Sequence, residues 1–530
     1  MRILLLYPLF PKSYWSFEKT IELIGRKVAY PPLGLITVAA ILPQTWEFRL
    51  VDHNVEKVTE ADWEWAEVVI LSGMIVQKED MLNLIREAKD RGKIVAAGGP
   101  YVTSVPGEAL KAGVDFLILD EGEITLPMFV EALEKGETSG VLRSNGEKAD
   151  VTKTPIPRYD LLDLTVYSDM SVQYSRGCPF QCEFCDIIVL FGRKPRTKEP
   201  KQVIAELQTL YDLGWRSPVF MVDDNFIGNK RNVKLMLREL IPWMADHGYP
   251  FSLITEASVN LAEDQELLDL MIAANFRAVF LGIETPDTDS LTLTKKHQNT
   301  RNSLVEAVNK INKSGLKVMA GFIMGFDGEK PGAGDRILQF VEATAIPNAM
   351  CSMLQALPGT ALWNRLEKEG RLLANKERGS ANQTTMTNFI PTRPIEDLAR
   401  EYVECFWELY DPKSYLGRAY RHHLNMQPRP HKPKAKMPEL VEIKAFLTVV
   451  WLQGVKRPTR YQFWQQFFSL LRLNPSAFKS YFVCCAQLEH FIEYRQIVRE
   501  QIEAQIAEYL ANKNQNTLSI KSESQEFVKA

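Results

Sequence analysis

The sequence predicts an α/β protein in three parts: an N-terminal doubly wound, Rossmann-like domain, a partial (β/α)6 barrel of the TIM type, and an α-helical C-terminal region. Short apolar runs rich in β-branched residues alternate with amphipathic helical patterns as far as about residue 365, and beyond it helical patterns dominate. A chain of 530 residues, 45% hydrophobic and 24% charged, is long enough for several domains and has the composition of a globular protein.

The first domain, residues 1–135, contains five short apolar runs that we expect to be strands. They are Ile3–Tyr7, Phe48–Val51, Val68–Leu71, Ile94–Ala97 and Phe116–Leu119. Amphipathic stretches such as Lys78–Asp90 and Ile124–Lys135 separate them, which predicts parallel strands with crossover helices. Ligands bind beyond the carboxyl ends of such strands, where Gly98-Gly99-Pro100 and Glu121-Gly122-Glu123 should lie. No Gly-x-Gly-x-x-Gly follows the first strand and no Walker loop occurs, which disfavours a dinucleotide or ATP site.

A polar, turn-rich linker, residues 136–169, precedes a second alternation over residues 170–365. Its predicted strands are Ser171–Tyr174, Val219–Val222, Phe251–Thr255, Ala278–Leu281, Lys317–Phe322 and Cys351–Leu354. The helical segments between them include Lys201–Leu213, Lys230–Ala245 and Arg301–Lys313. Six β/α units are two short of a complete barrel, so we expect a partial, open one.

Residues 366–511 predict helices, interrupted by the basic, proline-rich connector Pro428–Pro438. The polar stretch 512–530 that follows predicts a disordered tail.

Charge balance and cysteine content disfavour several classes of protein. Lys+Arg 63 against Asp+Glu 66 gives a net charge of -3, so no overall basic field exists to hold nucleic acid. Seven cysteines, three of them within eight positions, make a poor disulfide framework and predict a reducing, cytoplasmic location. The sequence contains no run of about 18 apolar residues, so we expect no membrane-spanning helix. The first ten residues predict a strand rather than a signal peptide.

The strongest chemical signal is a loop that places Cys178, Cys182 and Cys185 after the first strand of the second part. Three thiolates at spacings of four and three can hold one compact metal centre. Zinc is an alternative, but a structural zinc ion takes four protein ligands and the nearest histidine, His247, is far along the chain. A trio of buried free thiols is another alternative. A four-iron cluster on three cysteines leaves one iron open to a substrate.

This Cys-x-x-x-Cys-x-x-Cys loop, with Phe184 before its last cysteine, resembles the signature of radical S-adenosylmethionine (SAM) enzymes. The resemblance implies a [4Fe–4S] cluster on Cys178, Cys182 and Cys185 whose open iron binds SAM. It also implies SAM contacts at Phe184, Asp223, Asp224, Asn225, Glu256, Ser258, Glu284, Gly321, Ile323 and Gly325. The family usually has Gly-Gly-Glu where Asp223–Asn225 stand, and any one of the acidic residues alone could be an ordinary cap or turn former.

A doubly wound domain before such a barrel resembles the cobalamin-dependent radical SAM enzymes. Segments such as Phe180–Lys194 and Val222–Asn229 resemble the branch that contains the hopanoid C-2 methylases. The resemblance implies cobalamin contacts at Gly98, Gly99, Pro100, Glu121, Gly122 and Glu123. Many cobalamin domains supply a cobalt ligand from Asp-x-His-x-x-Gly. Asp52-His53-Asn54 departs from that pattern, so we expect His53 to be a loop or surface residue.

The resemblance implies a methyltransferase that acts on an unactivated carbon of a lipid or isoprenoid-like substrate. It needs a low-potential electron donor such as ferredoxin or flavodoxin. Cleavage of SAM yields a 5′-deoxyadenosyl radical that removes hydrogen from the substrate, and cobalamin delivers the methyl group. A rearrangement or cyclisation without methyl transfer and a non-catalytic cobalamin-binding sensor are the alternatives. A methylthiolating tRNA enzyme is disfavoured, because the first domain has no cysteine for a second cluster.

Residues 443–488 contain no acidic residue, six basic residues and ten aromatic residues. Basic charge with interfacial aromatic side chains is typical of helices that lie on an anionic membrane surface. A helical cap packed against the barrel is an equally open alternative. A nucleic-acid surface is disfavoured, because the aromatic residues are clustered rather than interleaved as stacking platforms.

Overall fold

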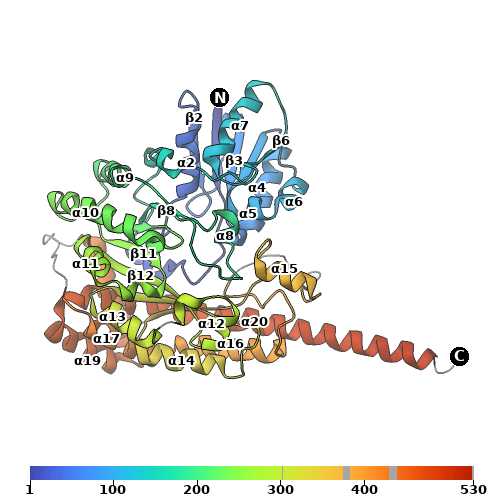
Figure 1. Ribbon diagram of the computed structural model, residues 1–530. Coiled ribbons are helices and arrows are strands. Elements are labelled where there is room, and N and C mark those ends of the chain that lie inside the picture. The colour runs from blue at the N-terminus through green and yellow to red at the C-terminus, as the bar shows by residue number, and fades with distance from the viewer. Residues whose placement is uncertain (301, 374–381, 429–438, 528–530) are drawn as a thin grey trace.

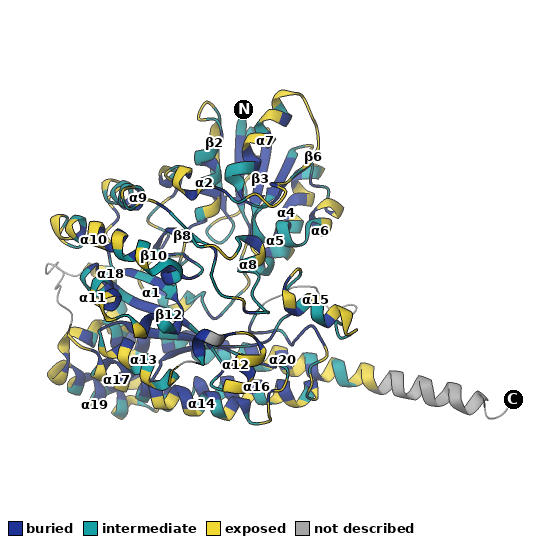
Figure 2. Ribbon diagram, in the orientation of Figure 1, coloured by how far each residue is buried: buried dark blue, intermediate teal, exposed yellow. Residues whose placement is uncertain are grey.

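The computed structural model describes residues 1–300, 302–373, 382–428 and 439–527. In Figure 1 the N-terminal domain (blue) lies above the second sheet and its helices (green to yellow), with most of the C-terminal helices (orange to red) below them. The predicted order of a doubly wound domain, a partial barrel and a helical region is confirmed. In Figure 2, buried residues follow the strands and the helix sides that face them.

The first sheet has six parallel strands in the order β2-β1-β3-β4-β5-β6. They are β1 (Arg2–Tyr7), β2 (Glu47–Asp52), β3 (Val68–Ser72), β4 (Ile94–Gly98), β5 (Phe116–Ile118) and β6 (Gly140–Leu142). The helices of this domain are α2 (Leu33–Ile41), α3 (Glu60–Trp65), α4 (Lys78–Asp90), α5 (Gly99–Ser104), α6 (Pro106–Lys111) and α7 (Gly122–Glu134). The strand order reverses between β1 and β3, which places the ligand crevice of the sheet there, at the carboxyl ends.

The five predicted strands of this domain are confirmed, but the predicted linker 136–169 contributes a sixth strand, β6, that pairs with β5. The sequence did not indicate β6 because it is an edge strand of only three residues, Gly140–Leu142, too short to show an alternating pattern.

The second sheet also has six parallel strands, and their order in the sheet is their order in the chain. They are β7 (Met170–Val172), β10 (Val219–Met221), β11 (Leu253–Ala257), β12 (Phe276–Glu284), β13 (Lys317–Met324) and β14 (Asn348–Met353). The accompanying helices are α9 (Pro200–Asp212), α10 (Lys230–Asp246), α11 (Gln265–Ala273), α12 (Thr288–Leu293), α13 (Leu304–Lys313) and α14 (Ala333–Thr344). In the part of the chain that the structure describes, β7 and β14 do not pair, so the barrel is open as predicted.

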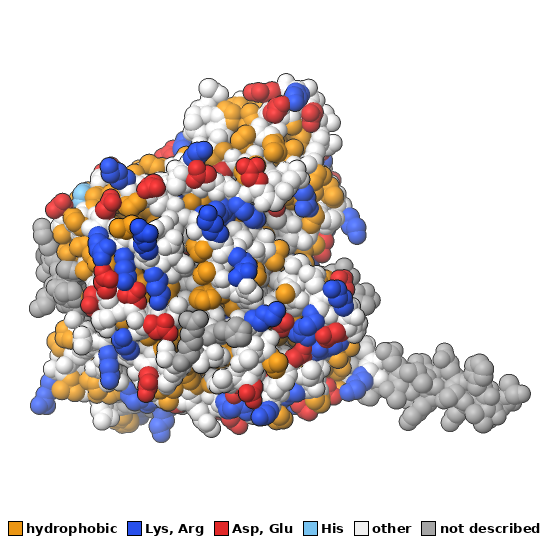
Figure 3. Space-filling model, in the orientation of Figure 1, with side chains coloured by type: hydrophobic (Ala, Val, Ile, Leu, Met, Phe, Trp, Pro, Cys, Tyr) orange, Lys and Arg blue, Asp and Glu red, His pale blue; other side chains and the backbone are white. Residues whose placement is uncertain are grey.

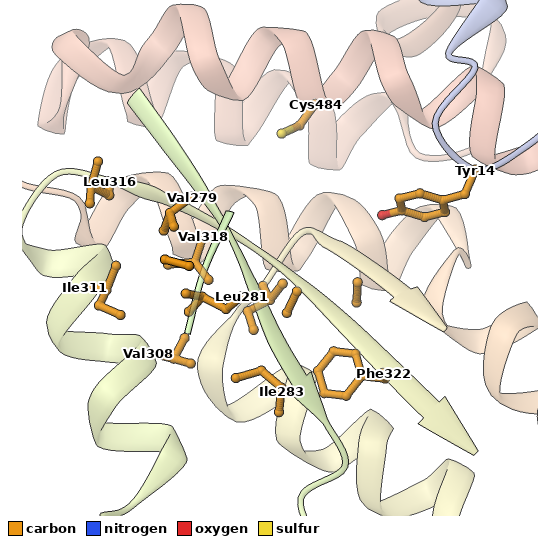
Figure 4. Packing of buried hydrophobic residues seen from close by; sticks show 14 of the residues in the cluster. Tyr14, Val279, Leu281, Ile283, Val308, Ile311, Leu316, Val318, Phe322 and Cys484 are labelled. Atoms are coloured by element: carbon orange, nitrogen blue, oxygen red, sulfur yellow. The ribbon is translucent and has the colours of Figure 1, made fainter. Parts of the chain in front are cut away.

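The outer face of the second sheet holds the largest core of the molecule. Val279, Leu281 and Ile283 of β12 are fully buried there and lie near Val308 of α13, as Figure 4 shows. Side chains alternate along a strand, so Phe280, which is only half-buried, faces the inside of the barrel. The helices therefore take the continuous apolar face of the strands, and the inner face is left for a ligand.

The C-terminal region covers the β14 edge of the sheet. Its helices are α15 (Ala361–Lys368), α16 (Ile395–Leu409), α17 (Pro412–Asn425), α18 (Leu440–Trp451), α19 (Arg460–Leu473) and α20 (Phe478–Phe527). Two tyrosine hydroxyls donate hydrogen bonds to backbone carbonyls of β14: Tyr402 to Cys351 at 3.1 Å and Tyr410 to Ala349 at 2.7 Å. None of the described helices combines the length and the apolarity that a membrane span requires.

The prediction of a disordered tail over residues 512–530 is wrong as far as Phe527, where α20 ends. Residues 512–527 contain neither proline nor glycine, so nothing in this stretch interrupts the hydrogen bonds of the helix. Residues 429–438 of the predicted connector Pro428–Pro438 lie outside the described residues.

The chain between β1 and α2, residues 8–32, leaves the first domain and crosses the barrel. This N-terminal segment includes α1 (Glu18–Leu23). Its Trp15 ring lies 5.3 Å from the Phe280 ring of β12, and its Tyr30 ring lies 5.2 Å from the Phe220 ring of β10. The sequence did not predict this path. The segment therefore brings two aromatic side chains against strands that line the inside of the barrel.

A buried ionic network joins the first domain to the barrel. Arg176 of β8 (Ser175–Arg176) donates to Glu121 at 3.0 Å and to Glu123 at 2.8 Å, and Arg196 of β9 (Arg196–Thr197) donates to Glu121 at 2.8 Å. The Glu121 side chain is 0% exposed and the Arg176 side chain is 13% exposed. Burial alone would raise the pKa of Glu123, but the adjacent Arg176 outweighs it and lowers that pKa to about 2.

Replacing Arg176→Met should destabilise the protein by about 3–5 kcal/mol, because Glu123 would remain buried without a cation and Glu121 would keep only Arg196. The measurement is chemical denaturation at neutral pH. The control is Arg158→Met, whose partner Asp160 is half exposed and whose loss should cost about 0–1 kcal/mol. Equal losses in the two variants would contradict a stabilising role for the network.

Candidate functional site

The three cysteines of the predicted metal loop lie between β8 and β9, which pair as a short antiparallel ladder. Cys178, Cys182 and Cys185 are free thiols. Burial raises the pKa of each thiol, and the charges of neighbouring cysteines of the trio raise the pKa values of Cys178 and Cys185 further. The ladder closes the loop between the two strands, so the three thiols belong to one potential metal centre.

Polar groups from elsewhere in the chain point at these sulfur atoms. The Asn225 Nδ2 atom lies 3.8 Å from Cys178 Sγ, and Gln298 Nε2 lies 3.8 Å from Cys182 Sγ. Lys296 adds positive charge that acts to lower the pKa of Cys182. Hydrogen-bond donors and a cation stabilise anionic thiolates, so these surroundings fit an iron–sulfur cluster bound by three cysteines.

Sequence reasoning missed Lys296, Gln298 and Asn299. Asn299 donates to the backbone carbonyls of Gly282 and Ile283, at 3.0 and 2.9 Å, and so fixes this stretch beside the end of β12. These residues lie more than a hundred positions after the cysteines and match no metal-binding pattern, so only the folded chain places them at the loop.

The alternative of a single bound ion finds no support in the geometry. Within the described ranges, no three His, Cys, Asp or Glu side chains converge closely enough to hold one metal ion. A four-iron cluster is wider than one ion and needs no such convergence. The three thiols with one open position therefore suit a cluster better than the four-ligand zinc site.

Asp223 and Asp224, expected to contact SAM, instead hold the turn that leads into the cysteine loop. Asp223 accepts hydrogen bonds from Tyr174 N at 3.3 Å and Ser175 Oγ at 2.6 Å, and Asp224 accepts one from Gly177 N at 3.1 Å. Burial raises the pKa of Asp223 to about 7 and that of Asp224 to about 6. Both oxygens of Asp223 accept bonds within the loop, which leaves it less available to a ligand than the sequence suggested.

Asn225 and Ser258 lie together, as predicted, at the ends of neighbouring strands. Asn225 Nδ2 donates to Ser258 Oγ at 3.3 Å, and Ser258 N donates to Asn225 Oδ1 at 3.2 Å. Glu256, on the inner face of β11, forms no hydrogen bond or ion pair with the described residues. Burial, and then the charges of Asp224 and Asp223, raise its pKa to about 7. Its carboxylate is therefore available to a cationic ligand.

Glu284 has a partner in the protein that the sequence did not suggest. Lys296 donates a short hydrogen bond to it, and the residue has a positive φ of 66°. This ion pair lies beside the cysteine loop, since the charge of Glu284 also influences Cys182. Glu284 thus neutralises the lysine at the loop and is not free to bind a second cation.

The remaining predicted contacts lie on and around β13. Gly321 leaves space next to the inward-facing Phe280, whose ring would lie 2.9 Å from a Cβ atom at that position. Gly325 has a φ of 106° and donates to Glu329 Oε2 at 3.0 Å. Ile323 and Phe184 belong to one apolar cluster at the mouth of the barrel. The adenine contacts at these positions stay a prediction, and their surroundings are apolar.

A cavity of about 290 Å³ lies between the carboxyl ends of the two sheets. Its first wall contains all the residues predicted to contact cobalamin: Gly98, Gly99, Pro100, Glu121, Gly122 and Glu123. Its second wall contains residues on either side of the cysteine loop, Gln173, Arg176, Leu190, Phe191 and Lys198, together with Val222, which follows β10. The cavity therefore adjoins both the crevice of the first sheet and the predicted metal centre.

Gly99 and His53 bear directly on how cobalamin fits this cavity. Gly99 has a φ of 86°, and a Cβ atom there would lie 2.3 Å from Ser72 Oγ, so the close approach of backbone to cavity requires glycine. His53 is not part of the lining, and its Nδ1 lies 2.8 Å from Asp80 Oδ2. The site thus suits a cobalamin that takes no cobalt ligand from His53.

Three family models match the chain. They are the B12 binding domain over residues 23–130, the Radical SAM superfamily over residues 172–341, and a domain of unknown function (DUF4070) over residues 360–504. These matches coincide with the first domain, the barrel and the C-terminal helices.

Two relatives and a solved structure extend this comparison. The chain is 65% identical to an "uncharacterized methyltransferase" of Synechocystis sp., over 97% of this chain and 96% of that protein. It is 34% identical to the hopanoid C-2 methylase of Rhodopseudomonas palustris, over 93% of each chain. The fold resembles the radical SAM methyltransferase TsrM from Kitasatospora setae, solved with cobalamin and a [4Fe–4S] cluster, with a TM-score of 0.60, 16% identity, and coverage of 95% of this chain and 99% of that one.

The matched domains imply three cofactors: a [4Fe–4S] cluster, SAM and cobalamin. Relatives that match nearly the whole chain are methyltransferases, which makes this chain an enzyme and disfavours the non-catalytic sensor. The protein belongs to the cobalamin-dependent radical SAM methyltransferase family.

Proposed function

We propose that the enzyme transfers a methyl group to an unactivated carbon of an apolar, isoprenoid-like lipid. The observation that carries this proposal is the cavity whose walls are the predicted cobalamin crevice and the flanks of the cysteine loop. When bound, the cluster supplies the electron that cleaves SAM, and cobalamin supplies the methyl group. One substrate carbon would have to meet the deoxyadenosyl group of SAM and then the methyl group on cobalamin, and a shared cavity would let it do so without leaving the protein.

In this proposal Cys178, Cys182 and Cys185 bind the cluster. Glu256, Asn225 and Ser258 bind the polar groups of SAM, because Glu256 has no other partner among the described residues. The adenine ring packs at Phe184, Gly321, Ile323 and Gly325. Asp223, Asp224 and Glu284 act as positioning residues: the two aspartates fix the loop, and Glu284 fixes Lys296.

Gly98, Gly99 and Pro100 of the cavity wall would hold one side of cobalamin. Glu121, Gly122 and Glu123 line the same wall, but the two glutamates are held by Arg176 and Arg196. Their role is therefore to fix the distance between the cobalamin crevice and the cysteine loop. The ion network also neutralises the negative charge that the two glutamates bring to the cavity wall.

The inner face of the barrel supports an apolar substrate. Half-buried apolar side chains line it on every strand from β10 to β14: Phe220, Ile254, Phe280, Met319 and Met350. Trp15 and Tyr30 of the N-terminal segment pack against this face. The 34% identical relative is called a hopanoid C-2 methylase, and such apolar surroundings suit a polycyclic hydrocarbon. A low-potential electron donor such as ferredoxin or flavodoxin completes the reaction.

Alanine at Cys178, Cys182 or Cys185 should abolish iron binding and the visible absorption of the cluster, because each thiolate is one of only three ligands. The measurement is iron content and absorption after anaerobic reconstitution. Cys351→Ala is the matched control, since Cys351 is a free cysteine buried away from the loop. Zinc in the purified protein, or a chromophore that survives all three changes, would refute the assignment.

Gly99→Ala should weaken cobalamin binding at least about tenfold, because the new methyl group collides with Ser72 and strains the backbone at the cavity wall. Binding is followed by the absorption spectrum of added cobalamin. Gly92→Ala is the control, since Gly92 has a similar φ of 70° but nothing within 4 Å of a new Cβ atom. Equal weakening in both variants would show that strain alone, not the cavity, is responsible.

The reconstituted enzyme, given SAM with a deuterated methyl group and a lipid extract, should yield 5′-deoxyadenosine and a lipid that carries the deuterated methyl. Mass spectrometry detects both products. Phe280→Ala should raise the KM for the lipid about tenfold, since it removes an apolar contact on the inner face. 5′-Deoxyadenosine without labelled lipid would favour the rearrangement or cyclisation, and absence of both products would overturn the proposal.

A further inference from the structure

The helices α18 and α19, with the turn Leu452–Lys456 between them, expose an unusual number of large apolar side chains. Leu440 is 86% exposed, Tyr461 77% and Trp451 60%, and Leu447, Phe468 and Leu473 are also mostly in solvent. On α18 the exposed residues recur at helical spacing, and Leu440, Ile443, Leu447 and Trp451 line a shallow hollow of about 410 Å³. We name residues 440–473 the docking face.

The charges of this face have one sign over most of its length. No acidic residue occurs between Ile443 and Leu473, whereas most of the surface in Figure 3 mixes basic and acidic side chains. Lys444, Lys456, Arg460 and Arg472 form no ion pair with the described residues. Arg457 is different, because it binds Glu489 of α20 with its Nε atom 2.9 Å from a carboxylate oxygen.

The structure also narrows the stretch 443–488 that the sequence singled out. Its last part belongs to α20, where Tyr481, Cys484, Cys485 and Leu488 are 0% exposed and pack in the main core. The expectation of a helical cap therefore applies to residues from 478 onward, whereas residues 440–473 form an open surface.

We propose that the docking face binds the surface of an anionic phospholipid bilayer. Apolar side chains at helical spacing enter the boundary between headgroups and acyl chains, and Trp451 and Tyr461 suit that boundary because they are amphipathic. The unpaired basic residues attract anionic headgroups. Membrane binding would give α18 and α19 a physical role. Both helices lie within residues 360–504, which match the domain of unknown function.

The docking face also contacts the N-terminal segment that crosses the barrel. α18 packs against α1 of the N-terminal segment, where Val441 lies 3.5 Å from the position of a Cβ atom on Gly25. The same segment places Trp15 against Phe280 on the inner face of the barrel.

The test is flotation of the full-length protein with vesicles of equal parts phosphatidylglycerol and phosphatidylcholine. The protein should float with these vesicles, float far less with pure phosphatidylcholine, and be released by high salt. Leu447→Glu combined with Trp451→Glu should reduce the bound fraction at least about tenfold, because charge is expelled from the apolar boundary. Lys444→Glu with Arg460→Glu should reduce binding roughly fivefold for each basic residue lost.

The matched control is Leu110→Glu combined with Leu235→Glu, since these leucines are about half exposed on α6 and α10, outside the docking face. The control should float like the unaltered protein, and circular dichroism should be the same for all variants. No flotation, or equal flotation of control and docking-face variants, would overturn the proposal. The proposal would also be overturned if sedimentation showed a dimer that only the docking-face variants dissociate. The docking face would then bind a second copy of the chain.

This assay contains no substrate, so its outcome is independent of whether the enzyme methylates a lipid. If the protein floats but no lipid is labelled by deuterated SAM, the proposed function fails and the docking stands. If a lipid in detergent is labelled but the protein does not float, the docking fails and the proposed function stands.

Discussion

The arrangement of the site depends on the buried contact between Arg176 and the two glutamates that follow β5. Glu121 and Glu123 begin α7 at the carboxyl edge of the first sheet, and Arg176 comes two residues before Cys178. A buried carboxylate without a cation would cost several kcal/mol, so the two domains can pack here only in the register that pairs these charges. That register makes one cavity out of the cobalamin crevice and the cysteine loop.

Several other charged side chains also hold the backbone and side chains around the cysteine loop in place. Asp223 and Asp224 accept backbone hydrogen bonds from the turn before Cys178, and Glu284 neutralises Lys296 beside Cys182. Each has a partner in the protein, whereas Glu256 has none in the described part of the chain. The fold thus pairs most of these acidic residues within the protein and leaves Glu256 unpaired among the described residues.

The C-terminal helices combine two surfaces with different physical roles. The α20 residues up to Leu488 pack against the barrel and shield the sheet, while α18 and α19 leave apolar and basic side chains in solvent. The N-terminal segment, residues 8–32, contacts α18 through α1 and contacts the inner face of the barrel through Trp15. The C-terminal helices and the N-terminal segment thereby connect the proposed membrane surface to the proposed reaction site.

The sequence by itself determined the fold class, eleven of the twelve strands of the two parallel sheets and the three cysteines, because periodic apolar runs and ligand spacing are local properties of a chain. It did not reveal that Asp223 and Glu284 are already paired, that Lys296 and Gln298 reach the cysteine loop, or that residues 8–32 cross the barrel. Those facts depend on contacts between residues far apart in the chain. Only tertiary structure decides which of several similar carboxylates acquires a partner, since propensity and spacing carry no information about it.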